Sequence, residues 1–333
     1  MQTTSILIQT LCVPCGCRCR YCLLSWDGTV TGAEWTRSVR TAERFLAELR
    51  EALPEVNSSF SFGCSMEHPQ LREALRTLRR LGSPQASFLQ CDGMRMRDDA
   101  QCRELMEMLL QEGVEGLNFT LYGLQAYHDR FAGRQGDYAL ILRMMRAAAL
   151  EGLAFTAGIP LTQENVHQAN ELIGRLQQAG CAQLRLFIPH EEGRGIHLSP
   201  IRLRRRDLDA LSPDARRLLN EEIYRTEADW LKLPDPAQET RRLLLVTLRR
   251  DNIEAYERLD ALSLVRSIEA LDEAYYQAFP DFSTLAEMYG DAAGDRFYRI
   301  RDLAAHYRRQ YAQEHGLKLY DVTDETQSGS RRY

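Results

Sequence analysis

The sequence predicts an α/β fold, a partial, open (β/α)6 barrel of the TIM type at residues 1–197 with a mainly helical C-terminal extension at 198–333. Short apolar runs alternate with longer segments in which apolar residues recur at helical spacing. The short runs are continuously apolar, as is typical of parallel strands covered on both faces. Six strands are too few for a complete eight-stranded barrel, so the barrel is expected to stay open.

The expected elements follow one another in βα order. The predicted strands are Ser5–Cys12, Ser58–Phe62, Ala86–Cys91, Gly116–Leu121, Ala154–Leu161 and Gln183–Ile188. The predicted helices are Gly32–Leu53, Pro69–Leu81, Asp98–Glu112, Tyr138–Leu150 and Asn165–Ala179. Glycine follows several of these helices, as expected of residues that end a helix in a left-handed conformation.

Past residue 197 the strand pattern weakens. Helices are expected at Asp207–Leu231, Ile253–Phe279, Ser283–Tyr289 and Asp295–His315, with a linker at Leu233–Pro236. The apolar run Arg242–Leu248 is a candidate for one more strand.

Composition excludes several functional classes. The 42 basic and 47 acidic residues are spread along the chain and give a net charge of −5, so no nucleic-acid partner is expected. No apolar stretch is long enough to span a bilayer, and no signal peptide is apparent, so we expect a cytoplasmic protein without a membrane partner. In a reducing compartment the nine cysteines indicate metal binding or catalysis before disulfides. Only two lysines are present, which argues against Schiff-base chemistry.

Four cysteines lie in the eight residues from Cys15 to Cys22, directly after the first predicted strand. Cys15, Cys19 and Cys22 form a Cys-x3-Cys-x2-Cys pattern, with Tyr21 before the last cysteine. Three thiolates on one tight loop suit an iron–sulfur cluster that keeps one iron free. The alternative is structural zinc, because Cys12 with Cys15 and Cys19 with Cys22 also form two CxxC pairs.

With this cysteine spacing and this aromatic residue, the chain resembles the radical S-adenosylmethionine (SAM) superfamily. The resemblance implies a partial barrel, a [4Fe-4S] cluster bound by Cys15, Cys19 and Cys22, and SAM held at the free iron. It also implies reductive cleavage of SAM to a 5′-deoxyadenosyl radical that abstracts hydrogen from a substrate. In such enzymes the cofactors carry the chemistry and the protein positions them.

Other residues of the SAM site are expected at the carboxyl ends of later strands, where ligands gather in parallel folds. The second strand leads into Gly63-Cys64-Ser65-Met66-Glu67, where the family carries a Gly-Gly-Glu motif that binds the ammonium group of SAM. Ser65 and Met66 depart from that motif, and Glu67 could instead cap the next helix. On the fourth strand, Asn118 and Thr120 are candidates for contacts with SAM, unless they face a helix.

Several further residues remain open. His128 beside Asp129 could carry protons or serve the structure, and Arg194 in Gly-Arg-Gly could pair with a substrate anion or form a surface ion pair. Cys12, Cys64 and Cys91 could form a second metal site or be inert thiols. Cys17 lies in the loop but off the three-cysteine spacing.

The predicted function is therefore that of a radical SAM enzyme acting on a small-molecule or peptide substrate, with an external electron donor such as flavodoxin or ferredoxin. No cysteine follows Cys181, so no C-terminal auxiliary iron–sulfur module is expected, nor is a leader-binding domain ahead of the first strand. The alternative is a non-catalytic binding or electron-transfer protein stabilised by zinc or an iron–sulfur cluster. That alternative has no need of SAM or of Glu67.

Overall fold

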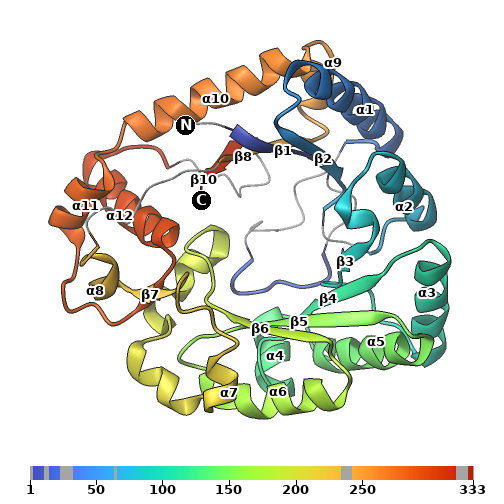
Figure 1. Ribbon diagram of the computed structural model, residues 1–333, viewed down its shortest axis with the longest axis horizontal. Helices are drawn as coiled ribbons and strands as arrows, with labels where there is room; N and C mark the ends of the chain where they lie inside the picture. The colour runs from blue at the N-terminus through green and yellow to red at the C-terminus, as the bar shows by residue number, and fades with distance from the viewer. Residues whose placement is uncertain are drawn as a thin grey trace.

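The computed structural model describes residues 3–10, 15–22, 33–63, 66–233, 242–319 and 329–332. Strands line the inside of an open ring and helices cover its outside (Figure 1). This is the partial barrel that the sequence predicts.

The barrel strands are β1 (Thr3–Thr10), β2 (Asn57–Ser61), β3 (Phe88–Gln90), β4 (Gly116–Thr120), β5 (Ala154–Pro160), β6 (Gln183–Phe187) and β8 (Arg242–Leu248). The helices of the first two hundred residues are α1 (Trp35–Ala52), α2 (Leu71–Arg80), α3 (Asp99–Gln111), α4 (Gln125–Ala132), α5 (Asp137–Glu151) and α6 (Ala169–Gln178). The six predicted strands and five predicted helices are all present. Helix α4 was not predicted.

The strands form two four-stranded sheets within the described residues. One sheet has the order β10-β8-β1-β2 and the other β3-β4-β5-β6, with no pairing between β2 and β3. All pairs among β1 to β6 and β8 are parallel, whereas β10 (Gly329–Arg332) is antiparallel to β8. The carboxyl ends of β1 to β6 therefore share one rim of the ring.

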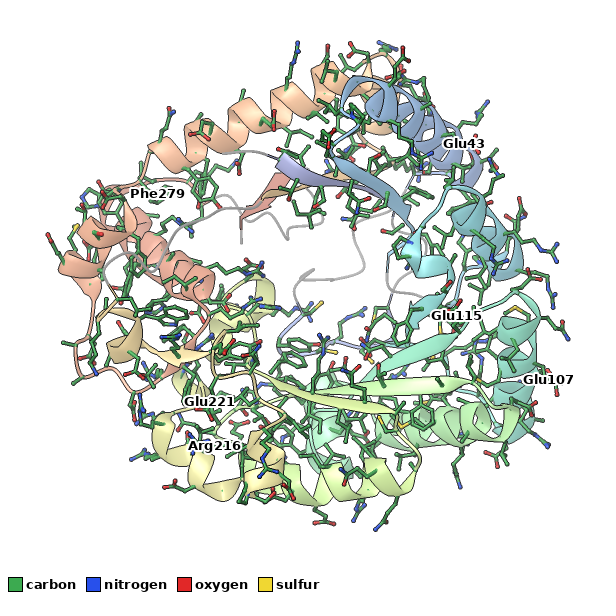
Figure 2. The ribbon with its side chains drawn as sticks, in the orientation of Figure 1. Glu43, Glu107, Glu115, Arg216, Glu221 and Phe279 are labelled. Carbon is green, nitrogen blue, oxygen red and sulfur yellow. The ribbon has the colours of Figure 1, made fainter. Side chains whose placement is uncertain are left out.

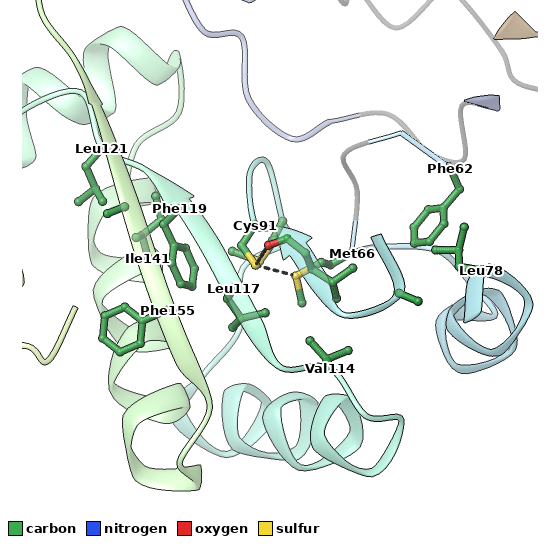
Figure 3. Close-up of a cluster of buried hydrophobic side chains, with 14 of the residues drawn as sticks. Phe62, Met66, Leu78, Cys91, Val114, Leu117, Phe119, Leu121, Ile141 and Phe155 are labelled. Carbon is green, nitrogen blue, oxygen red and sulfur yellow. Dashed lines mark hydrogen bonds between the residues drawn. The ribbon is translucent and has the colours of Figure 1, made fainter. Parts of the chain in front are cut away.

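The hydrophobic core lies between the strands and the outer helices. Leu117 and Phe119 of β4 are fully buried and pack toward α5, where Ile141 meets them (Figure 3). Because side chains alternate along a strand, Asn118 and Thr120 point to the opposite, inner face of the sheet. The sequence pattern thus directs polar residues of β4 into the barrel.

The C-terminal part combines helices with one strand of the barrel. β8 pairs with β1 in parallel, which confirms the strand expected at Arg242–Leu248. The helices are α9 (Ile253–Glu257), α10 (Ala261–Gln277), α11 (Phe282–Tyr289) and α12 (Ile300–His315). The predicted helix Ile253–Phe279 is broken where the side chain of Asp260 accepts a hydrogen bond from the backbone of Ser263 at 2.8 Å and caps α10.

One continuous helix at Asp207–Leu231 is a wrong prediction. The segment contains the end of the 3₁₀ helix η4 (Arg205–Ala210), the short helix α7 (Pro213–Arg216), strand β7 (Arg225–Thr226) and helix α8 (Glu227–Trp230). Ser212 caps α7 just before Pro213, and Thr226 caps α8. Each cap starts a new helix, because the capping residue itself has an extended backbone. Strand β9 (Phe297–Tyr298) pairs with β7 and precedes α12.

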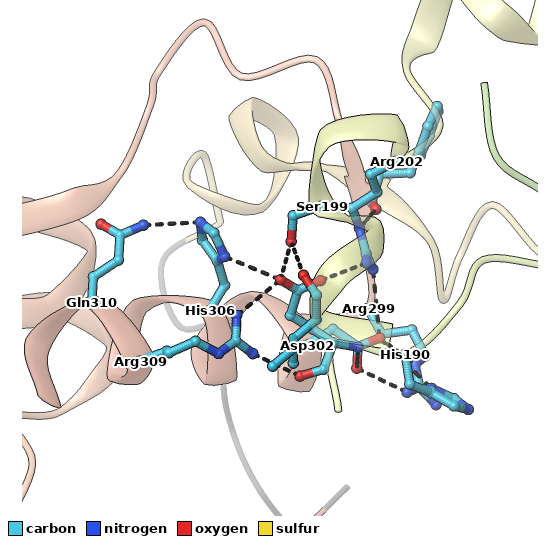
Figure 4. Close-up of polar contacts among 11 residues, drawn as sticks. His190, Ser199, Arg202, Arg299, Asp302, His306, Arg309 and Gln310 are labelled. Atoms are coloured by element: carbon cyan, nitrogen blue, oxygen red, sulfur yellow. Dashed lines mark hydrogen bonds and ion pairs between the residues drawn. The ribbon is translucent and has the colours of Figure 1, made fainter. Parts of the chain in front are cut away.

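A buried polar network joins α12 to the segment after β6 (Figure 4). The guanidinium of Arg202 donates to Glu191 Oε2 at 2.8 Å, and its Nε donates to the carbonyl of Phe297 at 2.6 Å. Arg309 of α12 donates to the other carboxylate oxygen of Glu191 at 3.1 Å, and the backbone N–H of Glu191 donates to Asp302 at 3.2 Å. The C-terminal helices are thereby held against the barrel.

The outer surface carries both signs of charge. Glu107, Arg216 and Glu221 are exposed, and Glu107 points away from the barrel (Figure 2). Among the described residues, no helix is both long and apolar enough to cross a membrane.

Candidate functional site

The cysteine loop, residues 15–22, is held by backbone hydrogen bonds to three separate parts of the rim. The N–H of Gly16 donates to the carbonyl of Gly93 at 2.8 Å, just after β3. The N–H of Arg18 donates to Ala132 at 2.7 Å, at the end of α4. The carbonyl of Cys22 accepts from the N–H of Arg194 at 3.0 Å, after β6. The loop therefore lies at the carboxyl ends of the strands, as predicted.

Gly93 allows the loop to approach β3 closely. Its φ angle is 62°, and a Cβ atom added there would lie 2.0 Å from Cys15 Sγ. Asp92-Gly93 is thus a turn in which only glycine leaves space for the thiol.

Three of the loop thiols gather together. A hydrogen bond with Cys17 and then burial raise the pKa of Cys15. Contact with Cys15 lowers the pKa of Cys17, but contact with Cys19, burial and the charge of Asp137 outweigh this effect, so the pKa of Cys17 is also raised. The hydroxyl of Tyr122 donates to Cys19 Sγ at 3.0 Å. Thiolates this close together would repel one another, which favours the neutral thiols; a bound cation or cationic cluster would relieve that repulsion.

Cys22 lies one turn beyond, its N–H donating to the carbonyl of Cys19 at 3.2 Å. No three histidine, cysteine, aspartate or glutamate side chains surround a common metal position in the part of the chain that the structure describes. The donor set itself, several soft thiols on one loop at the strand ends, fits an iron–sulfur cluster. Cys12 and Cys64 lie outside the described residues.

Tyr21 anchors the loop inside the barrel. Its ring centroid lies 5.5 Å from that of Tyr122 and 6.2 Å from those of Phe131 and Phe187. Burial is the first cause that raises the pKa of Tyr21, followed by the charge of Asp92. The aromatic residue of the cysteine pattern thus packs between the ends of β4 and β6.

Glu67 is engaged by arginine. Arg97, which is 6% exposed, donates to both carboxylate oxygens of Glu67, at 2.6 and 3.0 Å. The backbone N–H of Arg95 donates to Glu67 Oε1 at 3.1 Å. Since Gly93 touches Cys15, the short segment Gly93–Arg97 lies between the cysteine loop and Glu67. Sequence reasoning missed Arg97, which no spacing pattern connects with Glu67.

The rest of the predicted Gly63–Glu67 motif is partly described. Gly63 has a φ of 71°, and its carbonyl accepts from the side chain of Gln85 at 2.7 Å. Met66 is buried, and the thiol of Cys91 contacts its sulfur at 3.0 Å (Figure 3). Burial raises the pKa of Cys91, which is the behaviour of an inert core thiol. Ser65 lies outside the described residues.

Asn118 and Thr120 face the barrel interior, but neighbours already engage both side chains. Asn118 donates to Gln90, and its oxygen accepts from Thr156 Oγ1 at 2.8 Å. Thr120 Oγ1 accepts from Gln90 Nε2 at 3.3 Å and contacts Asp92 Oδ2 at 3.4 Å. The amide of Gln90 also donates to Asp92 at 2.7 Å.

Asp92, just after the strand predicted at Ala86–Cys91, is a site residue that was not among the predicted site residues. Burial, opposed by the hydrogen bond from Gln90, raises its pKa to about 6. Its carboxylate lies beside Thr120 and the cysteine loop. The position of Asp92 at a predicted strand end was the signal that could have identified it.

His128 has a structural role rather than the role of a proton carrier paired with Asp129. The ring is fully buried; its Nδ1 accepts from the N–H of Tyr122 at 3.1 Å, and its Nε2 lies 3.0 Å from Asp137 Oδ2. Asp129 instead accepts from the backbone of Gly136 and Tyr138, at 2.8 and 2.9 Å. Cys17 also contacts Asp137, with its sulfur 3.5 Å from Oδ2. The pair of His128 and Asp137 therefore packs against the cysteine loop and supports it.

No protein-family model matches the chain, and no curated protein matches it in sequence. Similar folds occur among solved structures. Streptococcus suis SuiB bound to its precursor peptide SuiA matches with a TM-score of 0.50 at 10% identity, over 77% of this chain and 61% of SuiB. SuiB bound to S-adenosylmethionine matches with a TM-score of 0.40 at 12% identity, over 55% and 38%.

Coproporphyrinogen III oxidase (HemN) from Escherichia coli, a radical SAM enzyme, matches with a TM-score of 0.42 at 13% identity, over 74% of this chain and 63% of HemN. The chain thus spans less than two thirds of each of these solved structures. Over 77% of its length the chain, an open partial barrel, is similar in fold to SuiB.

Proposed function

We propose that this protein is a radical SAM enzyme that abstracts hydrogen from a small-molecule or peptide substrate. The observation that carries the proposal is the cysteine loop, which hydrogen bonds clamp to the ends of β3, α4 and β6 at the rim where parallel barrels bind ligands. These backbone hydrogen bonds fix the position of the cysteine residues, so the loop does not depend on side chains elsewhere in the chain for its shape. A fold likeness alone does not imply an activity, so the chemistry of the site is the stronger support.

Cys15, Cys19 and Cys22 are the proposed ligands of a [4Fe-4S] cluster, and an external donor such as flavodoxin or ferredoxin is the proposed source of electrons. When bound, the cluster and SAM supply the 5′-deoxyadenosyl radical. The protein orients them: Gly93 leaves room for the Cys15 thiol, Tyr122 donates to Cys19, and Tyr21 closes the interior side of the loop.

The backbone at Gly63–Met66, including Ser65, and the carboxylate of Glu67 are the proposed contacts for the ammonium group of SAM. Arg97 and the backbone of Arg95 donate to Glu67, and Arg95 Nε lies 3.4 Å from its Oε2, so an ammonium group would take the place of one of these contacts while Arg97 orients the carboxylate. Asn118 and Thr120 are the proposed outer contacts on β4. Because neighbours engage both side chains, they would meet SAM through remaining lone pairs.

We further propose a barrel domain at 1–197 and a C-terminal extension at 198–333, in a cytoplasmic protein. The buried pairing of Glu191 with Arg202 supports tight docking of the two parts. Since β8 lies in the proposed extension and pairs with β1, the barrel sheet would contain strands from both the barrel domain and the extension.

The test is anaerobic reconstitution with iron and sulfide, followed by addition of SAM and dithionite and measurement of 5′-deoxyadenosine. The variants are Cys15→Ala, Cys19→Ala and Cys22→Ala, with Cys17→Ala as the matched control from the same loop. We expect product from the wild type and from Cys17→Ala, and none from the other three. Loss of product in Cys17→Ala but not in Cys22→Ala would overturn the ligand assignment.

The second candidate is a non-catalytic binding or electron-transfer protein stabilised by zinc or an iron–sulfur cluster. The ion pair between Glu67 and Arg97 favours this candidate, because Arg97 already neutralises the Glu67 carboxylate and no ammonium group of SAM is needed as its partner. The same experiment separates the two candidates. A cluster that assembles without SAM cleavage, or zinc retained after anaerobic reconstitution, would support the non-catalytic protein.

A further inference from the structure

A cavity of about 390 Å³ with a mixed polar and apolar lining lies on the sheet formed by β3, β4, β5 and β6. Its lining includes Phe88, Gln90, Asn118, Thr156, Gln183 and Arg185. Strand pairing places Gln90, Asn118, Thr156 and Gln183 side by side across the sheet. Phe88 and Gln183 are the first residues of β3 and β6, so the cavity extends to the amino ends of these strands.

A chain of hydrogen bonds across the sheet determines which polar atoms face the cavity. Thr156 donates to Asn118, Asn118 donates to Gln90, and Gln90 donates to Asp92. In this chain each residue donates to the next, and the Asp92 carboxylate is the final acceptor. The hydroxyl oxygen of Thr156 keeps its lone pairs as an acceptor for a ligand.

Arg185 supplies positive charge to this cavity. Its side chain is exposed, and no hydrogen bond or ion pair joins it to a carboxylate within the described residues. Arg185 Cζ lies 5.5 Å from the ring centroid of Phe187, the next residue on the same face of β6. This contact holds the guanidinium on the inner face of the strand.

We propose that the cavity binds a carboxylate-bearing ligand through Arg185, with Gln183 as a neighbouring donor and Thr156 as an acceptor for an N–H of the ligand. A guanidinium fork matches a carboxylate bidentately and neutralises its single charge. A phosphate monoester carries nearly two charges and would leave one without a partner. Phe88, which is 45% exposed, provides an apolar wall for the remainder of the ligand.

The inner face of β6 connects this cavity with the cysteine loop. Phe187 lies next to Arg185 on that face, and its ring centroid is 6.2 Å from that of Tyr21. Two residues along a strand span about 6.6 Å, so a ligand anchored at Arg185 can extend past Phe187 toward Tyr21. That this ligand is the substrate rests on the proposed function.

The test measures binding to the purified full chain without reconstitution, by saturation-transfer NMR and calorimetry. The probes are N-acetyl-L-alanine and the peptide acetyl-Ala-Ala-Ala, each with a free carboxylate or as the C-terminal amide. The small and peptide probes distinguish the two sources of a carboxylate. We expect at least one free carboxylate to bind tenfold or more tightly than its amide.

Arg185→Gln should abolish this preference and Arg185→Lys should retain part of it. Arg217→Gln is the control, because Arg217 is an exposed arginine on the outside of the protein that does not line the cavity. Equal binding of carboxylates and amides to the wild type, or an undiminished preference in Arg185→Gln, would overturn the proposal. Because the assay needs neither cluster nor SAM, these outcomes are independent of whether 5′-deoxyadenosine is formed.

Discussion

Substitution of Arg202 by methionine removes the centre of the network that joins α12 to the barrel. The side chains of Arg202 and Glu191 are 1% and 0% exposed. The substitution therefore leaves the buried Glu191 carboxylate without one of the positive charges that offset its negative charge. Breaking a buried pair in this way costs about 3–5 kcal/mol. Arg309 and His306 still contact Glu191, which favours the lower end of that range.

The pKa of Glu191 gives a second route to the magnitude. Burial raises this pKa, but hydrogen bonding to His306 and the charge of Arg202 outweigh burial and lower it from 4.5 to about 2. Such a lowering corresponds to about 3 kcal/mol of folding free energy as a net figure for the contacts with His306, Arg202, Ser199 and Arg309 together, of which Arg202 supplies one part. Because the folded pKa is depressed, this contribution is fully present above pH 4.5 and is lost as the pH falls toward 2.

The assay is urea unfolding followed by circular dichroism, at pH 7 and at a series of lower pH values. We expect Arg202→Met to lower the free energy of unfolding by about 3 kcal/mol at pH 7, and the difference to shrink below pH 4.5. Arg217→Met, at an exposed pair with Asp214, serves as the control and should change it little. A loss below 1 kcal/mol for Arg202→Met at pH 7 would refute the reasoning.

Three further substitutions test the site. Gly93→Ala places a Cβ against Cys15 Sγ and should reduce the iron bound after reconstitution to less than half of the wild-type content. The control is Gly152→Ala, because Gly152 also has a positive φ angle but no atom lies within 4 Å of an added Cβ, so this variant should bind iron normally. Equal iron contents in the two variants would contradict the packing argument. Glu67→Gln should weaken SAM binding to the reconstituted protein at least tenfold, as measured by calorimetry. Glu115→Gln is the control, because Glu115 is exposed. An unchanged affinity in Glu67→Gln would show that Glu67 only pairs with Arg97 and does not contact SAM. Asp137→Asn weakens contacts with His128 and Arg134 and should cost about 2 kcal/mol in urea unfolding, a prediction that a loss below 0.5 kcal/mol would reject.

The strands were predictable because each is a short run with regularly placed apolar or aromatic residues between turn residues, as in Gly116–Thr120, where Leu117 and Phe119 alternate with polar residues. Helix α4 was missed because only Tyr127 and Phe131 mark its apolar face, which is too little signal in eight residues. The predicted helix at Asp207–Leu231 failed because capping residues inside it start new short elements. Local hydrogen bonds overrode the general helical composition in that segment.

The site was predictable only as far as spacing carries information. The cysteine loop is local in sequence, so its pattern could be recognised. The pairing of Glu67 with Arg97 and the contact of Gly93 with Cys15 depend on how loops after different strands meet at the rim. Such contacts follow from tertiary structure, and no periodicity in a single sequence encodes them.

The clamping of the cysteine loop also constrains the order of folding. The three hydrogen-bonded partners of the loop lie near residues 93, 132 and 194, so the loop reaches its final form only after most of the barrel has assembled. Long-range contacts of this kind are made late because loop closure must precede them. Growing chains released before residue 194 lack the clamp from Arg194. Stable metal insertion should therefore be a property of the completed barrel and not of the nascent cysteine segment.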